Sequence, residues 1–278
     1  MNSAPAHSAL ADLEKTASRT ESPCGEGTLV ARRWGAGPPI VLLHGGGGSW
    51  THWVRNIPVL AATRSVWVPD LPGFGESALP LDGSDADAMT EPVESAIRQA
   101  FGDEACDMVG FSFGGMVAGF IAASHPQRVR RLVLVGTPGL GVTPESELPF
   151  ISWRKLTDPA QRTAAHRHNL NVLMLHHAAS IDDVAVALHA ANTARDRTKG
   201  RKLAFTDTLA HALQRVSCPV YGIWGEEDVL YRSRHDRLRA ALKAPDCREL
   251  TFIAGAGHWV QYERAASFNE TLLRMLAN

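Results

Sequence analysis

Short, nearly continuous apolar runs that alternate with helical stretches constrain the fold of this 278-residue chain more than any other feature. Six such runs, rich in Val, Ile and Leu, occupy residues 39–43, 65–68, 107–110, 131–135, 220–224 and 249–253. Runs of this kind are typical of strands buried on both faces, as in a parallel sheet. Helical patterns lie between them, for example at 91–101 and 114–124. We therefore expect an α/β protein whose mostly parallel central sheet carries helices on both faces.

The pattern changes between residues 139 and 210, where no strand-like run occurs. Amphipathic helical patterns take its place, one at 160–177 and another at 182–196. Pro138 and the glycines that follow it punctuate the entry to this region. We interpret 139–210 as a helical insertion between two strands, and 1–138 together with 211–278 as the core around the sheet.

The amino-acid composition limits the kinds of partner that the protein is expected to bind. The 28 Lys and Arg residues balance 29 Asp and Glu residues, so the net charge of −1 favours neither nucleic acid nor an anionic membrane. The four cysteines form no Cys-x-x-Cys pair, which suits a reduced cytoplasmic setting. The N-terminus lacks a secretory signal and no apolar run reaches membrane-spanning length. The sequence predicts a cytoplasmic protein with a peripheral helix from Ala9 to Ala17, and leaves open whether it forms a homo-oligomer.

The strongest local signal is Gly110-Phe111-Ser112-Phe113-Gly114, which fits Gly-x-Ser-x-Gly directly after a predicted strand and before a predicted helix. In that context the serine lies on a sharp, strained turn, and small neighbours let strand and helix approach closely. The hydroxyl then lies at the helix N-terminus, where developing negative charge is favoured. A chance glycine–serine turn is the alternative, but the context favours Ser112 as a catalytic nucleophile.

A serine hydroxyl is a weak nucleophile until a base, usually a histidine oriented by a carboxylate, takes its proton. His258 is the best candidate among twelve histidines, because it lies in a glycine-rich loop just after the last predicted strand. The acid should precede it in the chain, and Asp228 follows the strand at 220–224. Glu226 and Glu227 are rivals, and each of the three carboxylates could instead be a solvated surface charge. Asp228 is favoured because the loop must first turn over the sheet edge.

The segment after the first apolar run, His44 to Trp50, contains four consecutive glycines. Glycines let the backbone present N–H groups to an oxyanion, and the N–H of Phe113 should be the second donor. Gly46 is the predicted donor from this loop, with Gly47 as the alternative. A phosphate-binding loop is the competing interpretation, but the sequence lacks the Gly-Lys-Ser/Thr ending and the Gly-x-Gly-x-x-Gly pattern. His44 is interpreted as a structural buttress of the loop.

Taken together, these motifs resemble those of the α/β-hydrolase fold from about residue 25 to the C-terminus. Five segments carry the resemblance, in the expected order: His44–Gly47, Asp70–Ser77, Gly110–Gly115, Trp224–Asp228 and Gly257–Trp259. The resemblance implies the triad Ser112, Asp228 and His258, and a mainly structural role for the second segment. It also implies that 139–210 is a helical cap, or lid, that covers the triad. A metal site built from the cap's histidines is an alternative, but solvated or core positions are favoured for them, and we expect neither metal nor cofactor.

Within the family, the chain is most similar to meta-cleavage-product hydrolases and related carboxylesterases. The carbon–carbon bond hydrolases typically have Asn before the nucleophile, where this chain has Phe111. They also use a cap arginine, for which the sequence offers four candidates without a clear match: Arg154, Arg167, Arg195 and Arg197. We therefore rank hydrolysis of a small-molecule ester above cleavage of a 2-hydroxy-6-oxo-dienoate. A serine rather than aspartate nucleophile argues against dehalogenase and epoxide hydrolase chemistry.

The predicted mechanism is acyl transfer to Ser112 followed by hydrolysis, with His258 as the base in both steps. The expected partner is a small-molecule acyl substrate. Five residues are predicted to line its pocket, although core packing explains aromatic residues equally well: Gly47, Trp50, Phe111, Trp153 and Trp259. A catalytically idle receptor of the same fold is a third hypothesis, which the intact triad disfavours.

Overall fold

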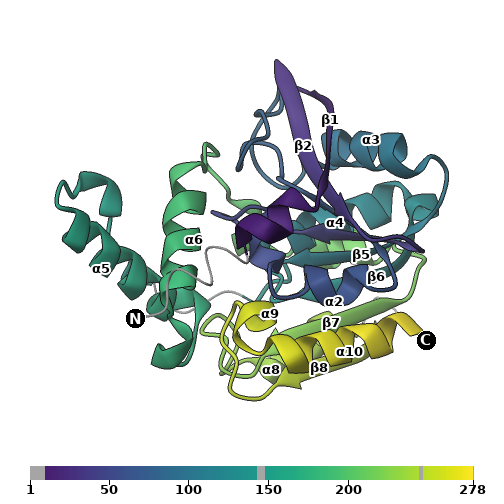
Figure 1. Cartoon of the computed structure of the whole chain (residues 1–278). Coiled ribbons are helices and arrows are strands. Elements are labelled where there is room, and N and C mark those ends of the chain that lie inside the picture. The colour runs from purple at the N-terminus through teal and green to yellow at the C-terminus, as the bar shows by residue number, and fades with distance from the viewer. Residues whose placement is uncertain (1–9, 143–147, 244–246, 278) are drawn as a thin grey trace.

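The computed structural model describes residues 10–142, 148–243 and 247–277. Its centre is an eight-stranded sheet in the order β1-β2-β4-β3-β5-β6-β7-β8 (Figure 1). The pairs from β4 through β8 are parallel, whereas β1 pairs with β2 and β2 with β4 in antiparallel orientation. The strands are β1 (Ser18–Cys24), β2 (Gly27–Trp34), β3 (Pro39–Leu43), β4 (Ser65–Pro69), β5 (Cys106–Phe111), β6 (Val129–Val135), β7 (Val220–Gly225) and β8 (Cys247–Ile253). The predicted fold class is confirmed.

Helices cover both faces of this sheet (Figure 1). The α-helices that follow the first two strands are α2 (Ile57–Ala61), α3 (Thr90–Phe101), α4 (Phe113–Ser124), α5 (Pro159–Asn169), α6 (Asp183–Ala194), α7 (Thr208–Leu213), α8 (His235–Ala241), α9 (Val260–Glu263) and α10 (Ala265–Ala277). Within the described ranges, each helix is too short or too polar to span a lipid bilayer.

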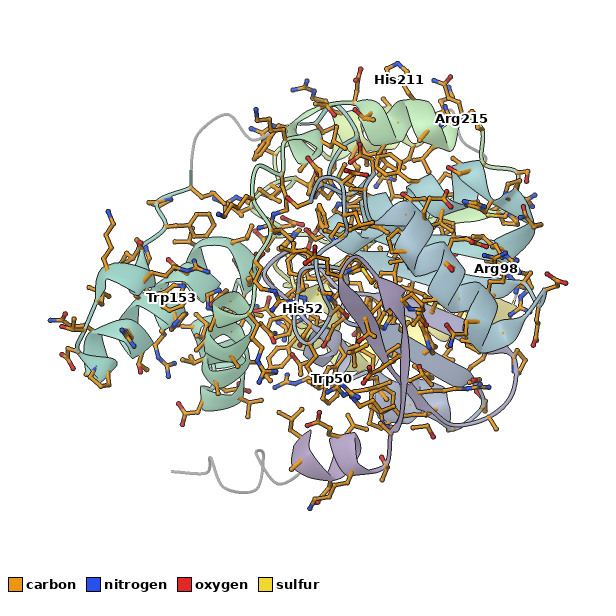
Figure 2. The ribbon with its side chains drawn as sticks, turned by 90° about the horizontal axis from the view of Figure 1, so that it is seen from above. Trp50, His52, Arg98, Trp153, His211 and Arg215 are labelled. Atoms are coloured by element: carbon orange, nitrogen blue, oxygen red, sulfur yellow. The ribbon has the colours of Figure 1, made fainter. Side chains whose placement is uncertain are left out.

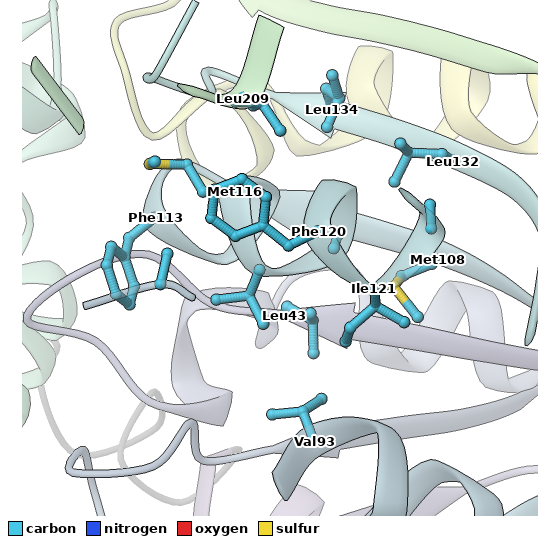
Figure 3. Packing of buried hydrophobic residues seen from close by; sticks show 14 of the residues in the cluster. Leu43, Val93, Met108, Phe113, Met116, Phe120, Ile121, Leu132, Leu134 and Leu209 are labelled. Carbon is cyan, nitrogen blue, oxygen red and sulfur yellow. The ribbon is translucent and has the colours of Figure 1, made fainter. Parts of the chain in front are cut away.

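Alternate side chains of each buried strand feed two separate hydrophobic clusters, because successive residues of a strand point to opposite faces. In β3, Val41 and Leu43 join the cluster that includes α3, α4, α7 and α8. Ile40 and Leu42 join the cluster that includes α2 and α10. Figure 3 shows the first cluster, where Leu43 lies among side chains of α4. All five residues of β3 are buried, which explains why its sequence is continuously apolar.

Between β6 and β7 the described residues form helices and loops, and α5 and α6 stand to one side of the sheet (Figure 1). A π-helical turn, Leu170–Met174, follows α5. Its buried residues, with Leu188 of α6, belong to the same cluster as α10. In contrast α7, which crosses the predicted boundary at residue 210, packs Leu209 into the cluster around α4 (Figure 3). The division into 1–138, 139–210 and 211–278 stays a prediction.

The structure adds an edge hairpin that the sequence analysis does not predict. β1 is mostly exposed, and β2 contains the buried Arg32, so neither forms a continuous apolar run. The Arg32 guanidinium pairs with Glu14 and Glu76 and lies 3.6 Å from Asp70. The predicted N-terminal helix is observed over residues 10–15, its first residue, Ala9, lying outside the described residues.

Candidate active site

Ser112 ends the turn between β5 and α4, with φ 50° and ψ −119°. Among the described residues it is the one non-glycine residue with a positive φ, a conformation that L-residues adopt at an energetic cost. The surrounding glycines permit this turn. A β-carbon on Gly110 would lie 2.4 Å from the Cα of Gly115, and one on Gly114 would lie 2.4 Å from the carbonyl oxygen of His44. The small residues of the motif are therefore required sterically.

Ser112, His258 and Asp228 form one chain of hydrogen bonds, although they come from three different loops. His258 Nδ1 lies 2.7 Å from Asp228 Oδ2, and His258 Nε2 lies 3.0 Å from Ser112 Oγ. Asp228 and His258 are buried, whereas Ser112 is partly exposed. When Nδ1 carries the proton and donates it to Asp228, Nε2 is left to accept the hydroxyl proton of Ser112. The three predicted triad residues are thus brought together in the predicted order.

The loop that follows β7 holds Asp228 behind His258. The backbone N–H of Leu230 donates to Asp228 Oδ1 at 3.0 Å. A β-carbon on Gly136, which has φ 53°, would lie 3.2 Å from the His258 ring and 3.5 Å from Asp228 Oδ2. Burial, reinforced by the Asp228 charge, raises the pKa of Tyr231 well above its usual value, so this phenol stays neutral beside the acid. The rival Glu226 is exposed at the same strand end.

The glycine-rich loop after β3 begins directly beside the nucleophile. A β-carbon on Gly45 would lie 3.2 Å from the Ser112 Cβ. Gly47 has φ 62°, and both Gly46 and Gly47 are partly exposed in an otherwise buried segment. Phe113 is the first residue of α4, and N–H groups in the first turn of a helix have no acceptor within it. The predicted oxyanion donors, Gly46 and Phe113, therefore lie on two segments that flank Ser112.

His44 and Asp70 fix the base of this loop. The N–H of Leu71 donates to His44 Nε2 at 2.8 Å, which leaves Nδ1 to donate to the carbonyl of Gly45. Burial lowers the pKa of His44, against the opposing charge of Asp70, so the ring stays neutral. Asp70 accepts hydrogen bonds from the N–H groups of Trp50 (2.9 Å) and Glu76 (3.0 Å). This arrangement matches the buttressing role expected of His44.

The predicted pocket aromatics occupy different environments. Phe111 is fully buried, and its ring centroid lies 5.0 Å from that of His258. Trp259 is also buried and stacks on Tyr262 at 4.2 Å. Trp50 packs against Trp34 in the hydrophobic cluster that includes α2 and α10, with ring centroids 5.4 Å apart. The structure therefore brings Phe111 to the triad directly, but not Trp50.

Trp153 lies on the helical segment, away from Trp50 and His52 (Figure 2). It lines a hollow of about 500 Å³ between α5 and α6, together with His166 and Asp183. The three triad residues are not part of that lining. Its role in binding substrate stays a prediction.

Two residues near the site were not singled out from the sequence. His52 is buried between Phe111 and Trp259, with ring centroids 5.5 Å and 4.9 Å away. Burial, with the neighbouring His44, lowers its pKa well below the usual value, and the Gly45 N–H donates to its Nδ1 at 3.3 Å. The sequence did offer a signal for His52, because this histidine lies only four residues after Gly48, the last glycine of the loop.

Arg201 is the second. A β-carbon on Gly46 would lie 2.3 Å from its Nη1, and its Cζ lies 5.5 Å from the Phe113 ring centroid. The guanidinium therefore lies next to Gly46 and near the Phe113 ring, and it bonds Asp196 at 3.1 Å.

Of the four cap arginines considered from the sequence, three make contacts with residues other than the triad. Arg154 donates to the carbonyl of Thr193 and Arg167 pairs with Asp183. Arg197 donates to the carbonyls of Gly75 and Ser77, and Arg195 is exposed. Because Arg201 lies in a polar run after α6, no periodic pattern distinguishes it from these neighbours.

One set of three side chains within the described ranges has the spacing to hold a metal ion: Glu91, Glu94 and His125. Glu94 is already bonded by Arg128 at 2.8 Å. The set lies on α3 and at the end of α4, a 12-residue helix about 18 Å long, so it is remote from Ser112. It has no part in the chemistry considered below.

Comparisons with known proteins agree with this fold. The sequence profile of the alpha/beta hydrolase fold family matches residues 38–173. The 2-hydroxymuconate semialdehyde hydrolase of Pseudomonas sp. (strain CF600) is 31% identical over 253 residues, which are 84% of this chain and 85% of that protein. The acetyltransferase component of the acetoin cleaving system of Pseudomonas putida is 32% identical over 86% of this chain, which spans 64% of that protein's length. Among solved structures, the esterase RhEst1 from Rhodococcus sp. ECU1013 has a TM-score of 0.76 at 23% identity, covering 94% of this chain and 99% of that chain.

The chain belongs to the α/β-hydrolase family and is an enzyme of that fold. Its relatives include a 2-hydroxy-6-oxo-6-phenylhexa-2,4-dienoate hydrolase, a 2-hydroxymuconate semialdehyde hydrolase and, over 40% of this chain, a pimeloyl-[acyl-carrier protein] methyl ester esterase. Family membership alone leaves the scissile bond open, because one fold hosts many chemistries.

Proposed function

We propose that this enzyme hydrolyses a small-molecule carboxylic ester through an acyl-enzyme on Ser112. The observation that carries the proposal is the continuous chain from Asp228 through His258 to the Ser112 hydroxyl, with contacts of 2.7 Å and 3.0 Å. His258 takes the hydroxyl proton as Ser112 attacks the carbonyl, and the N–H groups of Gly46 and Phe113 bind the tetrahedral oxyanion. His258 then protonates the leaving alcohol, and water releases the acyl group in the reverse sequence.

Hydrolysis of p-nitrophenyl acetate and butyrate by the wild type and Ser112→Ala tests this proposal. We expect turnover to fall about a millionfold in the variant, because removal of the nucleophile in comparable triads has that effect. A fluorophosphonate probe should label the wild type at Ser112 and leave the variant unlabelled. Near-normal hydrolysis by Ser112→Ala would contradict the assignment, and a folded wild type that takes no label would favour a receptor role.

A second candidate is hydrolysis of the carbon–carbon bond of a 2-hydroxy-6-oxo-dienoate. Arg201 favours it, because a guanidinium beside Gly46 suits a substrate that bears a carboxylate. Phe111 disfavours it, because an apolar ring stands where the carbon–carbon hydrolases typically have Asn. The buried Phe111 ring is part of the site itself, so ester hydrolysis ranks first.

Loss of ultraviolet absorbance from a ring-fission dienoate distinguishes the two activities. If the second candidate is correct, Arg201→Gln should raise KM for the dienoate far more than for p-nitrophenyl butyrate, which carries no charge. Arg195→Gln is the matched control, since Arg195 is exposed on the same segment. Dienoate hydrolysis that is absent while ester hydrolysis is rapid would exclude the second candidate.

A further inference from the structure

The carboxylate of Glu263 binds three backbone N–H groups in the interior. Glu263 is the last residue of α9 and is 7% exposed. Its Oε2 accepts from the N–H of Gly257 at 2.7 Å and from that of His176 at 2.9 Å, and its Oε1 accepts from that of His177 at 2.7 Å. One side chain thus joins the loop before His258 to the segment that follows the π-helical turn.

Both neighbours of His258 are fixed to the same segment. Gly257, the residue before it, donates to Glu263, and Trp259, the residue after it, donates to the carbonyl of Met174 at 2.7 Å. The two segments touch so closely that a β-carbon on Gly257 would lie 2.8 Å from the His176 nitrogen. The backbone on each side of His258 is therefore held from outside its own loop.

We propose that Glu263 is a positioning residue that holds the His258 backbone so that Nε2 stays in line with Ser112. Asp228 orients the imidazole ring, and Glu263 fixes the loop from which that ring projects. Hydrogen bonds to a buried carboxylate are stronger than those between neutral groups, and no neutral side chain of the same shape can accept from all three donors. The proposal rests on the proposed function, in which His258 is the base.

The test compares Glu263→Gln with Glu263→Asp and with the control Glu270→Gln, which removes the same charge from an exposed site on α10. The Gln variant keeps the size of the side chain but turns an amide NH₂ toward an N–H group. The Asp variant keeps the charge but is one methylene too short to reach both segments. A displacement of about 1 Å in a catalytic group can cost on the order of 100-fold in rate.

Both variants should therefore lose about 10- to 100-fold in kcat for p-nitrophenyl butyrate, with KM nearly unchanged. The low-field proton resonance of His258 Nδ1–H should shift or broaden in both, whereas Glu270→Gln should match the wild type in every measurement. Should the Gln variant fail to fold, the Asp variant carries the test, because it retains the negative charge at this position.

Folded Glu263 variants with the kcat and the His258 resonance of the control would overturn the proposal. A loss confined to melting temperature, with kcat per titrated active site unchanged, would also overturn it. If the wild type itself hydrolyses no ester, the proposed function fails, and the resonance alone then decides whether Glu263 positions His258.

Discussion

The strained backbone of Ser112 makes the site dependent on the residues around it. A φ of 50° at a serine persists only where neighbouring contacts hold it. The N–H of Ser112 donates to the Val135 carbonyl at 2.7 Å, and the N–H of Gly115 donates to the Ser112 carbonyl at 2.9 Å. These bonds fix the serine between the end of β6 and the first turn of α4. In the proposed mechanism, the hydroxyl is thereby presented to His258 before any substrate arrives, which would avoid reorganisation during the reaction.

At the acid, Asp228→Asn should lower kcat for p-nitrophenyl butyrate by about 10⁴-fold, the size of the effect in a comparable triad. The Asn amide can donate to His258 Nδ1, and the ring proton then lies on Nε2. With that proton in place, Nε2 can no longer accept the proton of Ser112. Steady-state kinetics with active-site titration measures the effect. Glu226→Gln is the control, because this exposed carboxylate lies two residues away. A larger loss in Glu226→Gln than in Asp228→Asn would assign the acid to the rival residue.

At the scale of elements, the close contact between α4 and β3 sets the geometry of the nucleophile and the glycine-rich loop together. Gly114→Ala would bring a methyl group to 2.4 Å from the carbonyl oxygen of His44 and 2.6 Å from that of Leu43. Backbone carbonyls at the start of this loop cannot move aside without displacing Gly46. We expect a loss of about 1–3 kcal/mol in the free energy of unfolding, as for other overpacked sites, with a fall in kcat.

Gly119→Ala is the matched control on the same helix. Its added methyl would lie 2.4 Å from Leu209 Cδ1, the end of a flexible side chain, and alanine favours the helix. Urea unfolding and ester kinetics of both variants decide the matter. The interpretation of the elbow would be wrong if Gly114→Ala were as stable and as active as Gly119→Ala.

The same element contacts explain which features could be predicted from the sequence. Strands β3 to β7 are largely buried, so their positions are encoded in local apolar runs, and Ser112 and Asp228 each follow such a run. Strand β8, which precedes His258, is only partly buried, but its last residues still form an apolar run. The edge strand β1 is mostly exposed, and Arg32 in β2 is buried only through partners distant in sequence, so no local apolar pattern reveals either strand. Arg201 escapes prediction for the same reason, because its contact with Gly46 bridges 155 positions of sequence.

At the scale of the whole molecule, the two ends of β5 carry different groups: the proposed nucleophile at one end and a buried ion-pair network at the other. Ser112 follows its carboxyl end, and Asp107 lies near its amino end, five residues and about 17 Å away. Asp107 is fully buried and bonds three arginines: Arg64, which precedes β4, and the consecutive residues Arg130 and Arg131 of β6. Arg64 also donates to the Leu276 carbonyl in α10, at 3.3 Å. This network connects the sheet to the C-terminal helix, at the end of β5 opposite Ser112.

The Asp107 network should govern the stability of the enzyme in acid. Burial alone would raise the pKa of Asp107, but hydrogen bonds and charges from Arg130 and Arg64 outweigh burial and lower it. A carboxyl group whose pKa is lower in the folded state stabilises the fold above its unfolded pKa, about 3.9, and loses that contribution as the pH falls through the folded value. The free energy of unfolding of the wild type should therefore fall below about pH 4. Asp107→Asn should be less stable at pH 7, because it leaves three partly buried arginines without their shared carboxylate, and its deficit should shrink as the pH falls. Urea unfolding followed by tryptophan fluorescence between pH 3 and 7 measures both curves.

Asp103→Asn, at a fully exposed carboxylate, is the control and should follow the wild type throughout. A deficit in Asp107→Asn that stayed constant from pH 7 to pH 3 would mean that this carboxylate does not titrate with unfolding, and acid sensitivity would then have to arise elsewhere.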